Sequence, residues 1–438
     1  MIRALIYVVL ILVVVCLVQG SSAQSATVSF PLGLMGPSGD TPPQLGTLTQ
    51  KLADTTSHGF NIVYEFRGVQ EISDAEDYLN KAQAAGLKVV QNMPVCRLYQ
   101  PNRPICGQPP VPLWTEVEWA NFISTLAAHN NLVAWYLPDE IDNFQAAANL
   151  YQWLHTYDPL DRPVYGNPGS FDQSVINLFP AFTEFLWAVS YPELSGEPRA
   201  LTTHMMKLDA NACRGTNTQW GAILQFFDSA HFPEYGRVGH PTARQLRSDS
   251  YQAIIGGAKG LWYFNYEMGK GDGLDELWSE MITVTDEIIG SGGLVEVILA
   301  PDVPQGIITH IISGPAQSPP TQGQVYDSIQ TLQKWRTGDG TYLFAVNIAT
   351  DTVVAEFSNL WPATSTVQVL FEGRTRPISD KLFGSFQDSF APDDVHIYFY
   401  PAPRPAPPLT QIYLPIVIKP APKLYLYLPL ILKSSSVY

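Results

Sequence analysis

The stretch Leu132–Asp142, with the sequence LVAWYLPDEID, joins a short apolar strand to an abrupt acidic end. Pro138 has no N–H to donate to a sheet, so we expect the strand to stop just before it. Asp139 and Glu140 follow at once, and Asp142 comes two residues later. Carboxylates at the exit of a buried strand are costly to desolvate without a partner or a chemical role. In a barrel of alternating strands and helices, that exit is also where active sites lie.

The chain around this stretch alternates short apolar runs with longer amphipathic ones, from residue 28 to about residue 295. The apolar runs are predicted strands: Ser29–Met35, Ile62–Phe66, Lys88–Met93, Val133–Leu137, Val164–Gly166, Trp187–Tyr191, Gly221–Phe226 and Leu261–Asn265. The amphipathic runs predict helices, including Thr47–Thr56, Asp74–Ala85, Thr115–Ala128, Phe144–Thr156 and Ala243–Ile255. This alternation predicts parallel pairing in a closed (β/α)8 TIM barrel over residues 27–295. A doubly wound open sheet is the alternative, but the first turn, GLMGPSGD, lacks the GxGxxG spacing of a phosphate-binding loop.

The pattern changes after the predicted barrel. Strand-like runs separated by turn residues predict a small antiparallel β-sandwich over residues 296–400. Its predicted strands are Val295–Leu299, Ile307–Ile312, Ile329–Trp335, Tyr342–Asn347, Val353–Phe357, Thr366–Phe371 and Val395–Tyr400. Residues 401–438 form a Pro-rich linker and a tail in which a Tyr-Leu-Pro motif occurs twice. The tail is interpreted either as a tag for sorting or cell-surface attachment, or as two strands that pack on the sandwich.

The first 23 residues have the features of a secretion signal. Arg3 supplies the positive start, Ala4–Val18 is apolar, and Ser21, Ser22 and Ala23 offer a small-residue cleavage site. A membrane anchor is the alternative, but this apolar run is shorter than the about 20 residues that span a bilayer. We therefore expect a secreted protein, either extracellular or at the cell surface.

Charge and cysteine content exclude several classes of partner. Without the signal segment the chain carries 24 basic and 40 acidic side chains, which argues against binding to nucleic acid and to anionic membranes. Of the remaining cysteines, Cys96 and Cys106 bracket a Pro-rich loop and are the preferred disulfide, which leaves Cys213 over. No Cys-x-x-Cys or His-x-x-x-His spacing occurs, so we expect no metal and no other cofactor.

Carboxylates and aromatic rings gather at the predicted strand exits. Glu65 and Arg67 follow strand two, Asp139 and Glu140 follow strand four, and Tyr191 and Glu193 follow strand six. Gln225 and Asp228 lie at the end of strand seven, and Tyr266 and Glu267 follow strand eight. Trp135 and Trp262 lie on strands four and eight. Sugars present apolar faces that stack on aromatic rings and hydroxyls that bond to carboxylates and amides. A glycosidase needs one acid to protonate the leaving oxygen and a second to act as nucleophile or to activate water.

With these residues the chain resembles the retaining clan of (β/α)8-barrel glycoside hydrolases, as a divergent member with a C-terminal β-sandwich. In that clan the fourth strand ends in Asn-Glu, and the Glu is the acid/base. Glu140 matches this Glu, whereas Asp139 stands where the clan has Asn. Trp262 resembles the clan's sugar-stacking Trp. The clan's nucleophilic Glu after strand seven is absent, since Gln225 and Asp228 stand there.

Three interpretations of this departure stay open. Asp228 is the second carboxylate, Glu267 is, or the site is catalytically inactive. Glu267 is preferred because it directly follows a strand and precedes a Gly-rich loop, and Glu193 is held in reserve. Asp139 is expected to tune Glu140, because two adjacent acids raise one pKa. Glu65 and Arg67 are interpreted as a salt bridge or as contacts to sugar hydroxyls.

The sequence therefore predicts a secreted glycoside hydrolase acting on a poly- or oligosaccharide, with Glu140 as proton donor, Glu267 as its partner and Asp139 beside them. Predicted substrate contacts are Glu65, Arg67, Trp135, Tyr191, Glu193, Gln225, Asp228, Trp262 and Tyr266. Two other classes stay open. A non-catalytic carbohydrate-binding barrel keeps the aromatic rings but needs no second acid. A structural cell-surface protein predicts no cleft with converging carboxylates. The chain has no Gly-x-Ser-x-Gly motif, which excludes a standard serine hydrolase.

Overall fold

The computed structural model describes residues 30–39, 42–65, 71–98, 112–141, 143–303, 306–360, 364–379 and 384–401, and the backbone of two short strands in the tail. The chain divides into two compact units, Met1–Gly293 with Pro320–Gln324, and Leu294–Pro319 with Val325–Tyr438. The predicted signal segment, Arg67, Cys106 and Asp142 lie outside the described residues. No helix in the described part is long and apolar enough to cross a membrane.

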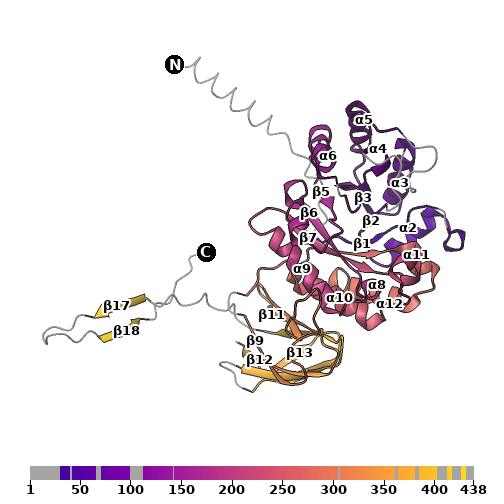
Figure 1. Cartoon of the computed structure of the whole chain (residues 1–438). Coiled ribbons are helices and arrows are strands. Elements are labelled where there is room, and N and C mark those ends of the chain that lie inside the picture. The colour runs from indigo at the N-terminus through magenta and orange to yellow at the C-terminus, as the bar shows by residue number, and fades with distance from the viewer. Residues whose placement is uncertain are drawn as a thin grey trace, which may run out of the picture. The chain divides into compact units, whose positions relative to one another are not determined.

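The first unit is a closed barrel in which the strands follow one another in chain order, so the predicted (β/α)8 fold is confirmed (Figure 1). The strands are β1 (Leu32–Met35), β2 (Ile62–Tyr64), β3 (Lys88–Asn92), β4 (Leu132–Tyr136), β5 (Val164–Gly166), β6 (Phe185–Ser190), β7 (Gln219–Gln225) and β8 (Leu261–Phe264). Each strand pairs in parallel with the next, and β8 closes the ring on β1, with Leu32 opposite Leu261. All eight lie within three residues of the predicted strands.

Helices follow the strands around the barrel (Figure 1). They are α2 (Leu48–Ser57), α3 (Ile72–Ala84), α4 (Val95–Leu98), α5 (Glu116–Leu126), α6 (Phe144–Tyr157), α7 (Gln173–Ile176), α8 (Pro192–Ser195), α9 (Ala200–Ala212), α10 (Ala243–Ile255), α11 (Tyr266–Gly271) and α12 (Asp275–Ile288). Thr47, Thr115 and Thr242 start α2, α5 and α10 with capping boxes. In each box the Thr hydroxyl accepts from the N–H three residues on, and the Gln or Glu there accepts from the Thr N–H. These local signals are why the amphipathic runs begin as helices where they do.

Aromatic rings fill the inside of the barrel. Trp187 and Trp262 stack with their ring centres 4.0 Å apart, and Tyr64 stacks on Trp262 at 5.4 Å. Side chains alternate between the two faces of a strand, so the neighbouring positions point outward. Trp135 is one of these and packs in the apolar layer between strands and helices. The barrel is thus a packed core with no pore through it.

A buried ion pair fixes the start of β4, the strand that precedes Asp139 and Glu140. Arg162 Nη1 donates to Asp158 Oδ1 at 2.8 Å, and both side chains are 1% exposed. The same guanidinium also donates to the carbonyl oxygen of Leu132 at 2.8 Å. Trp135 Nε1 donates to the other Asp158 oxygen at 2.8 Å. These bonds hold β4 from its first residue and so position its acidic exit.

The second unit contains two antiparallel sheets, as predicted. One has the strand order β10 (Ile329–Arg336), β11 (Gly340–Asn347), β16 (Val395–Tyr400), β13 (Thr366–Val369) and β14 (Arg374–Pro377). The other has the order β15 (Gly384–Phe390), β12 (Val353–Leu360) and β9 (Ile308–Ser313). The predicted strand Val295–Leu299 is wrong, because Val295–Ile298 forms helix α13. Periodicity cannot separate helix from strand in so short an apolar run.

The two copies of the tail motif pair with each other. Backbone strands β17 (Ile412–Ile416) and β18 (Leu426–Leu430) are antiparallel, with Leu414 opposite Leu428. The attachment role expected of the tail stays a prediction.

Candidate active site

A cavity of about 360 Å³ lies at the C-terminal end of the barrel, since most of its lining residues end or follow strands. Its carboxylates are Asp139, Glu140 and Glu234. Aromatic rings from four loops and strands line it as well: Phe171, Tyr191, Phe232, Tyr235 and Phe264. Its volume falls within the range of small-molecule sites, and this end of the barrel is where such folds place their chemistry.

Glu140 occupies a strained turn at the edge of this cavity. Its φ is +50°, in the left-handed region that residues other than glycine seldom adopt, and its side chain is exposed. Such a backbone costs about 1–3 kcal/mol and occurs often at functional sites. A Cβ on Gly169 would come 2.5 Å from Glu140 Cγ, so only glycine leaves room for the Glu140 side chain. The fold therefore keeps Glu140 in this position despite the strain.

Asp139 is held by two hydrogen bonds from neighbouring strand ends. Tyr136 donates its hydroxyl to Asp139 Oδ1 at 3.1 Å, and Asn167 Nδ2 donates to the same oxygen at 3.0 Å. Asn167 Oδ1 in turn accepts from the Gly169 N–H at 2.8 Å. One amide thus joins the β4 exit to the glycine on which the Glu140 side chain lies. Asp139 lines the cavity beside Glu140, and the tuning of Glu140 expected of Asp139 stays a prediction.

Tyr191 contributes a half-buried ring on the β6 side of the cavity. Burial raises its pKa well above the usual value, and the charges of Asp139 and Glu140 raise it further. The phenol therefore stays protonated near these two carboxylates and can donate a hydrogen bond. The substrate contact expected of Tyr191 stays a prediction.

Glu234 is a cavity residue that the sequence reasoning missed. It lies on the short 3₁₀ helix Pro233–Tyr235 in the loop between β7 and α10, and its side chain is exposed. Asp228 anchors this loop, because its Oδ1 accepts from the N–H groups of Ala230 at 2.8 Å and Gly239 at 3.0 Å. Partial burial opposes ionisation of Asp228, but these N–H groups outweigh it and lower its pKa. Asp228 thus acts as a loop anchor and does not line the cavity.

Glu267, the preferred second carboxylate, lies in a different hollow. Its side chain is 9% exposed and its Oε1 accepts from the Ser38 N–H at 2.6 Å. The same oxygen lies 3.6 Å from Nζ of Lys51, whose side chain is fully buried. A Cβ on Gly36 would come 2.2 Å from the other oxygen, so the β1 exit closes over this carboxylate. Glu267 is absent from the lining of the Glu140 cavity, and its contacts give it a structural role.

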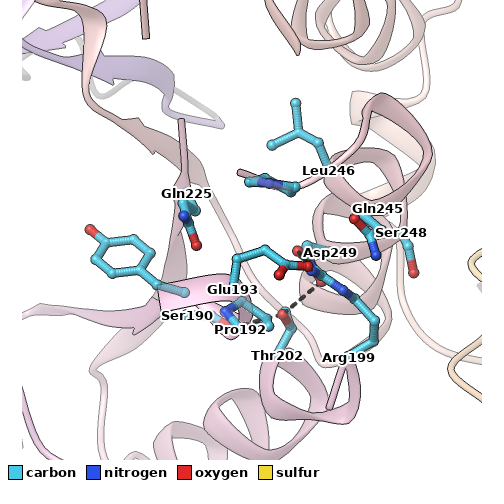
Figure 2. Close-up of polar contacts among 12 residues, drawn as sticks. Ser190, Pro192, Glu193, Arg199, Thr202, Gln225, Gln245, Leu246, Ser248 and Asp249 are labelled. Atoms are coloured by element: carbon cyan, nitrogen blue, oxygen red, sulfur yellow. Dashed lines mark hydrogen bonds and ion pairs between the residues drawn. The ribbon is translucent and has the colours of Figure 1, made fainter. Parts of the chain in front are cut away.

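Glu193 does not line the cavity and lies in a charged cluster with Arg199 and Asp249 (Figure 2). It forms an ion pair with Arg199, whose other nitrogen lies 2.8 Å from Asp249 Oδ2. Asp249 also accepts from the Thr202 hydroxyl at 3.2 Å. The cluster ties α8 to α9 and α10, so the predicted sugar contact at Glu193 is replaced by a structural ion pair.

Several predicted substrate contacts are wrong because the side chains are buried in the core. Trp135 and Trp262 have no exposed surface, and each packs against other rings or the helix layer. Tyr266 is 2% exposed and donates its hydroxyl to Asp54 Oδ2 at 2.9 Å. Gln225 is 1% exposed and bonds only within the protein among the described residues. Glu65 is also buried and lies outside the cavity lining, while Arg67 is not described.

The described residues contain no group of three His, Cys, Asp or Glu side chains that could hold a metal ion. Cys213, the cysteine left over in the predicted pairing, is a free and buried thiol. The predicted Cys96–Cys106 disulfide stays a prediction, because Cys106 lies outside the described residues.

The missed cavity residues differ in how far the sequence could have indicated them. Asn167 directly follows β5, so the strand-exit argument that selected Glu140 also selects Asn167 when applied to that strand. Glu234 comes nine residues after the last residue of β7, within a loop. The loop anchored by Asp228 brings Glu234 back to the cavity, and no pattern in the neighbouring sequence indicates this position.

Comparisons with known proteins agree with the fold. No family model and no curated protein matches the chain. An Anoxybacillus α-amylase structure matches with a TM-score of 0.54 and 10% identity, covering 85% of this chain and 98% of the amylase. A GH27 β-L-arabinopyranosidase of Geobacillus stearothermophilus gives 0.54 and 10%, covering 87% and 98%. A cyclomaltodextrinase gives 0.51 and 10%, covering 84% and 74%. At this identity the likeness shows the fold alone, which is that of (β/α)8 glycoside hydrolases.

Proposed function

We propose that the protein is a secreted glycoside hydrolase that cleaves a poly- or oligosaccharide in the Glu140 cavity. The observation that carries this proposal is that exposed carboxylates from two separate loops, Glu140 and Glu234, line one cavity together with aromatic rings. Carboxylates on two sides of a ligand and rings for stacking are what glycosidic bond cleavage requires.

Glu140 is the proton donor in this proposal. Its strained turn and the space left by Gly169 direct its carboxyl group to the cavity edge. Asp139, held by Tyr136 and Asn167, keeps a second negative charge close by. A neighbouring carboxylate favours the protonated form of Glu140, which is the form that a general acid needs.

Glu234 is the second carboxylate in this proposal. Asp139 adjoins Glu140 in the chain and shares its turn, whereas the two acids of a glycosidase flank the scissile bond. Glu234 reaches the cavity from the β7 exit, and β5 and β6 separate β7 from β4 around the closed barrel. In this proposal Glu234 therefore approaches the ligand from another side than Glu140. It acts either as nucleophile or as the base that activates water, according to the separation of the two carboxyl groups.

A non-catalytic carbohydrate-binding barrel is the second candidate function. It is favoured by Gln225, because the end of β7 carries an internally bonded amide in place of a carboxylate. In that case Glu234 contacts sugar hydroxyls without taking part in bond cleavage. Secretion by the predicted signal segment and surface attachment by the repeated tail belong to both candidates and stay proposals.

The test is hydrolysis of a panel of polysaccharides and nitrophenyl glycosides by the full-length protein and three Glu→Gln variants. Glu140→Gln and Glu234→Gln each remove an ionisable proton without changing the size of the side chain. We expect each to lower kcat by about 10²–10⁴-fold, the usual contribution of an acid or base group. Glu276→Gln is the matched control, because Glu276 is exposed on α12, outside the cavity lining.

The outcomes separate the candidates. Loss of turnover in both cavity variants, with activity unchanged in Glu276→Gln, supports a hydrolase. Turnover that survives Glu140→Gln contradicts its role as proton donor. Sugar binding in all four proteins without hydrolysis of any substrate favours the carbohydrate-binding barrel.

A further inference from the structure

The inner part of the cavity is apolar over half of the barrel. Val189 on β6 and Ile223 on β7 are register partners, and Phe264 on β8 and Met35 on β1 are another such pair. All four line the cavity. They belong to consecutive strands around the barrel. Residues within strands lie deeper than residues that follow the strand ends. These four residues therefore form the apolar floor of the cavity.

Polar side chains line the cavity at the exits of four strands. Asp139 and Glu140 follow β4, Asn167 and Ser170 follow β5, Tyr191 and Ser195 follow β6, and Glu234 lies in the loop after β7. A sugar held for protonation by Glu140 therefore has hydroxyl partners at these exits. Its deeper edge meets the apolar floor.

Gln225 cannot supply a partner for a ligand at the floor. Its Oε1 accepts from the Leu194 N–H at 3.3 Å, and its Nε2 donates to the Phe227 carbonyl at 3.1 Å and to Ser229 Oγ at 3.2 Å. The side chain is 1% exposed, and Figure 2 shows it beside the β6 exit. The polar residue that ends β7 is thus bonded within the protein.

Ser190 is the polar residue that ends β6, and it too is bonded internally. Its hydroxyl lies 2.8 Å from Thr202 Oγ1 in a fully buried contact on the outer side of the strand. A ligand hydroxyl that enters the floor therefore loses its water without gaining a partner from the four floor side chains, or from Ser190 and Gln225, the last residues of β6 and β7. An unpaired buried hydroxyl is unfavourable, whereas a methyl group gains from burial in the same place.

We propose that the sugar residue bound here is a 6-deoxyhexose, with its methyl group on the apolar floor. This inference rests on the proposed function, since it names the substrate class of the same site. An N-acetyl group would also bring a methyl, but its amide N–H and carbonyl need partners that the floor residues lack. The single carbon of a 6-deoxy sugar makes no such demand.

The experiment measures binding by calorimetry to Glu140→Gln, which holds sugars without cleaving them. The probes are four sugar pairs that differ by one hydroxyl: D-fucose and D-galactose, L-fucose and L-galactose, L-rhamnose and L-mannose, and 6-deoxy-D-glucose and D-glucose. In at least one pair we expect the 6-deoxy sugar to bind about 10–100-fold more tightly, the discrimination that an apolar pocket exerts against an added hydroxyl.

A floor variant ties this preference to the floor. Val189→Thr keeps the side-chain shape and adds a hydroxyl, so we expect the preference for the 6-deoxy sugar to shrink. Val117→Thr is the matched control, because Val117 is 77% exposed on α5 and outside the cavity lining. A preference that is the same in Val189→Thr and Val117→Thr overturns the role of the floor.

Equal or tighter binding of the hydroxylated sugar in every pair overturns the inference, and so does the absence of binding by all eight sugars. Hydrolysis of ordinary hexosides without any 6-deoxy preference leaves the proposed function standing and removes the inference alone. A 6-deoxy preference without hydrolysis of any substrate supports the inferred sugar class and contradicts the proposed hydrolase function.

Discussion

Glu140 and Glu267 both lie within a few residues of a strand end, yet their surroundings are opposite. Glu140 is exposed in a strained turn and lines a cavity with other carboxylates and rings. Glu267 is nearly buried, accepts from the Ser38 N–H and lies beside the buried Lys51. Glu267 is held by contacts within the protein, whereas Glu140 lines the cavity. A carboxylate at a strand exit is thus a catalytic candidate only when the fold leaves it accessible.

The largest expected effect concerns the Glu267 side of this comparison. Lys51→Met leaves the Glu267 carboxylate nearly buried without its cation, and we expect a loss of about 3–5 kcal/mol in the free energy of unfolding. Urea unfolding measures this loss. Lys81→Met is the matched control, because Lys81 pairs with Asp77 at the surface and such pairs contribute at most about 1 kcal/mol. The double variant Lys51→Met, Glu267→Met should regain most of the stability, and failure to do so would show that the ion pair is not the cause.

Asp209 extends the comparison to a buried carboxyl without a partner. It is fully buried on α9, and both side-chain oxygens have no hydrogen-bond partner among the described residues. Burial raises its pKa well above the usual value. The folded state therefore keeps a proton that the unfolded state releases above about pH 4, so this group lowers stability as the pH rises towards its folded pKa.

Asp209→Asn removes this pH dependence while keeping the side-chain shape. We expect the variant to gain about 1–3 kcal/mol over the wild type at pH 8 and much less at pH 4. Thermal unfolding at both pH values measures the difference. An equal effect at the two pH values would contradict a raised pKa at Asp209.

Gly169→Ala tests the Glu140 side directly. The glycine has a φ of +55°, and an added Cβ would come 2.5 Å from Glu140 Cγ. We expect a stability loss of about 1–2 kcal/mol from the left-handed backbone, together with a fall in kcat because the Glu140 side chain must move. The matched control is Gly215→Ala, since Gly215 also has a positive φ of 79° but nothing near its Cβ. If both variants keep full activity, Gly169 does not position Glu140.

The smallest expected effect lies at the other end of the barrel, where His155 stands near Glu184 and Asp161. The Glu184 carboxylate, whose Oε1 lies 3.4 Å from His155 Nε2, raises the pKa of His155 to about 9, Asp161 adds to this, and partial burial opposes it. The stabilising charge is fully present below about pH 6.5 and is lost as the pH rises through about 9. His155→Gln should therefore cost less than about 1 kcal/mol at pH 6 and almost nothing at pH 10, with kcat unchanged. Melting curves and activity assays check both statements, and a loss that grows with pH would contradict the raised pKa.

Much of the barrel could be predicted because its signals are local. Apolar runs of strand length, capping residues such as Thr47 and Thr242, and Pro138 after β4 depend on near neighbours in the chain. The same locality explains the errors. The positions of Trp135 and Trp262 near strand ends predict sugar contacts, but Trp135 points outward into the helix layer and Trp262 inward into the barrel, so both are buried. Aromatic rings at strand ends are needed to fill a closed barrel, so their presence alone does not indicate a sugar platform.

The sequence by itself determined the eight strand–helix units, the sandwich after them and the acidic exit at Glu140, because periodicity and strand-end chemistry act over a few residues. Only the tertiary structure decided which carboxylates meet. Closure of the barrel brings the β7 loop with Glu234 to the β4 exit, and the same closure places Glu267 against Lys51 and Ser38. The physical reason is that a carboxylate's role depends on what surrounds its oxygens. Those surroundings come from residues tens to hundreds of positions away in the chain.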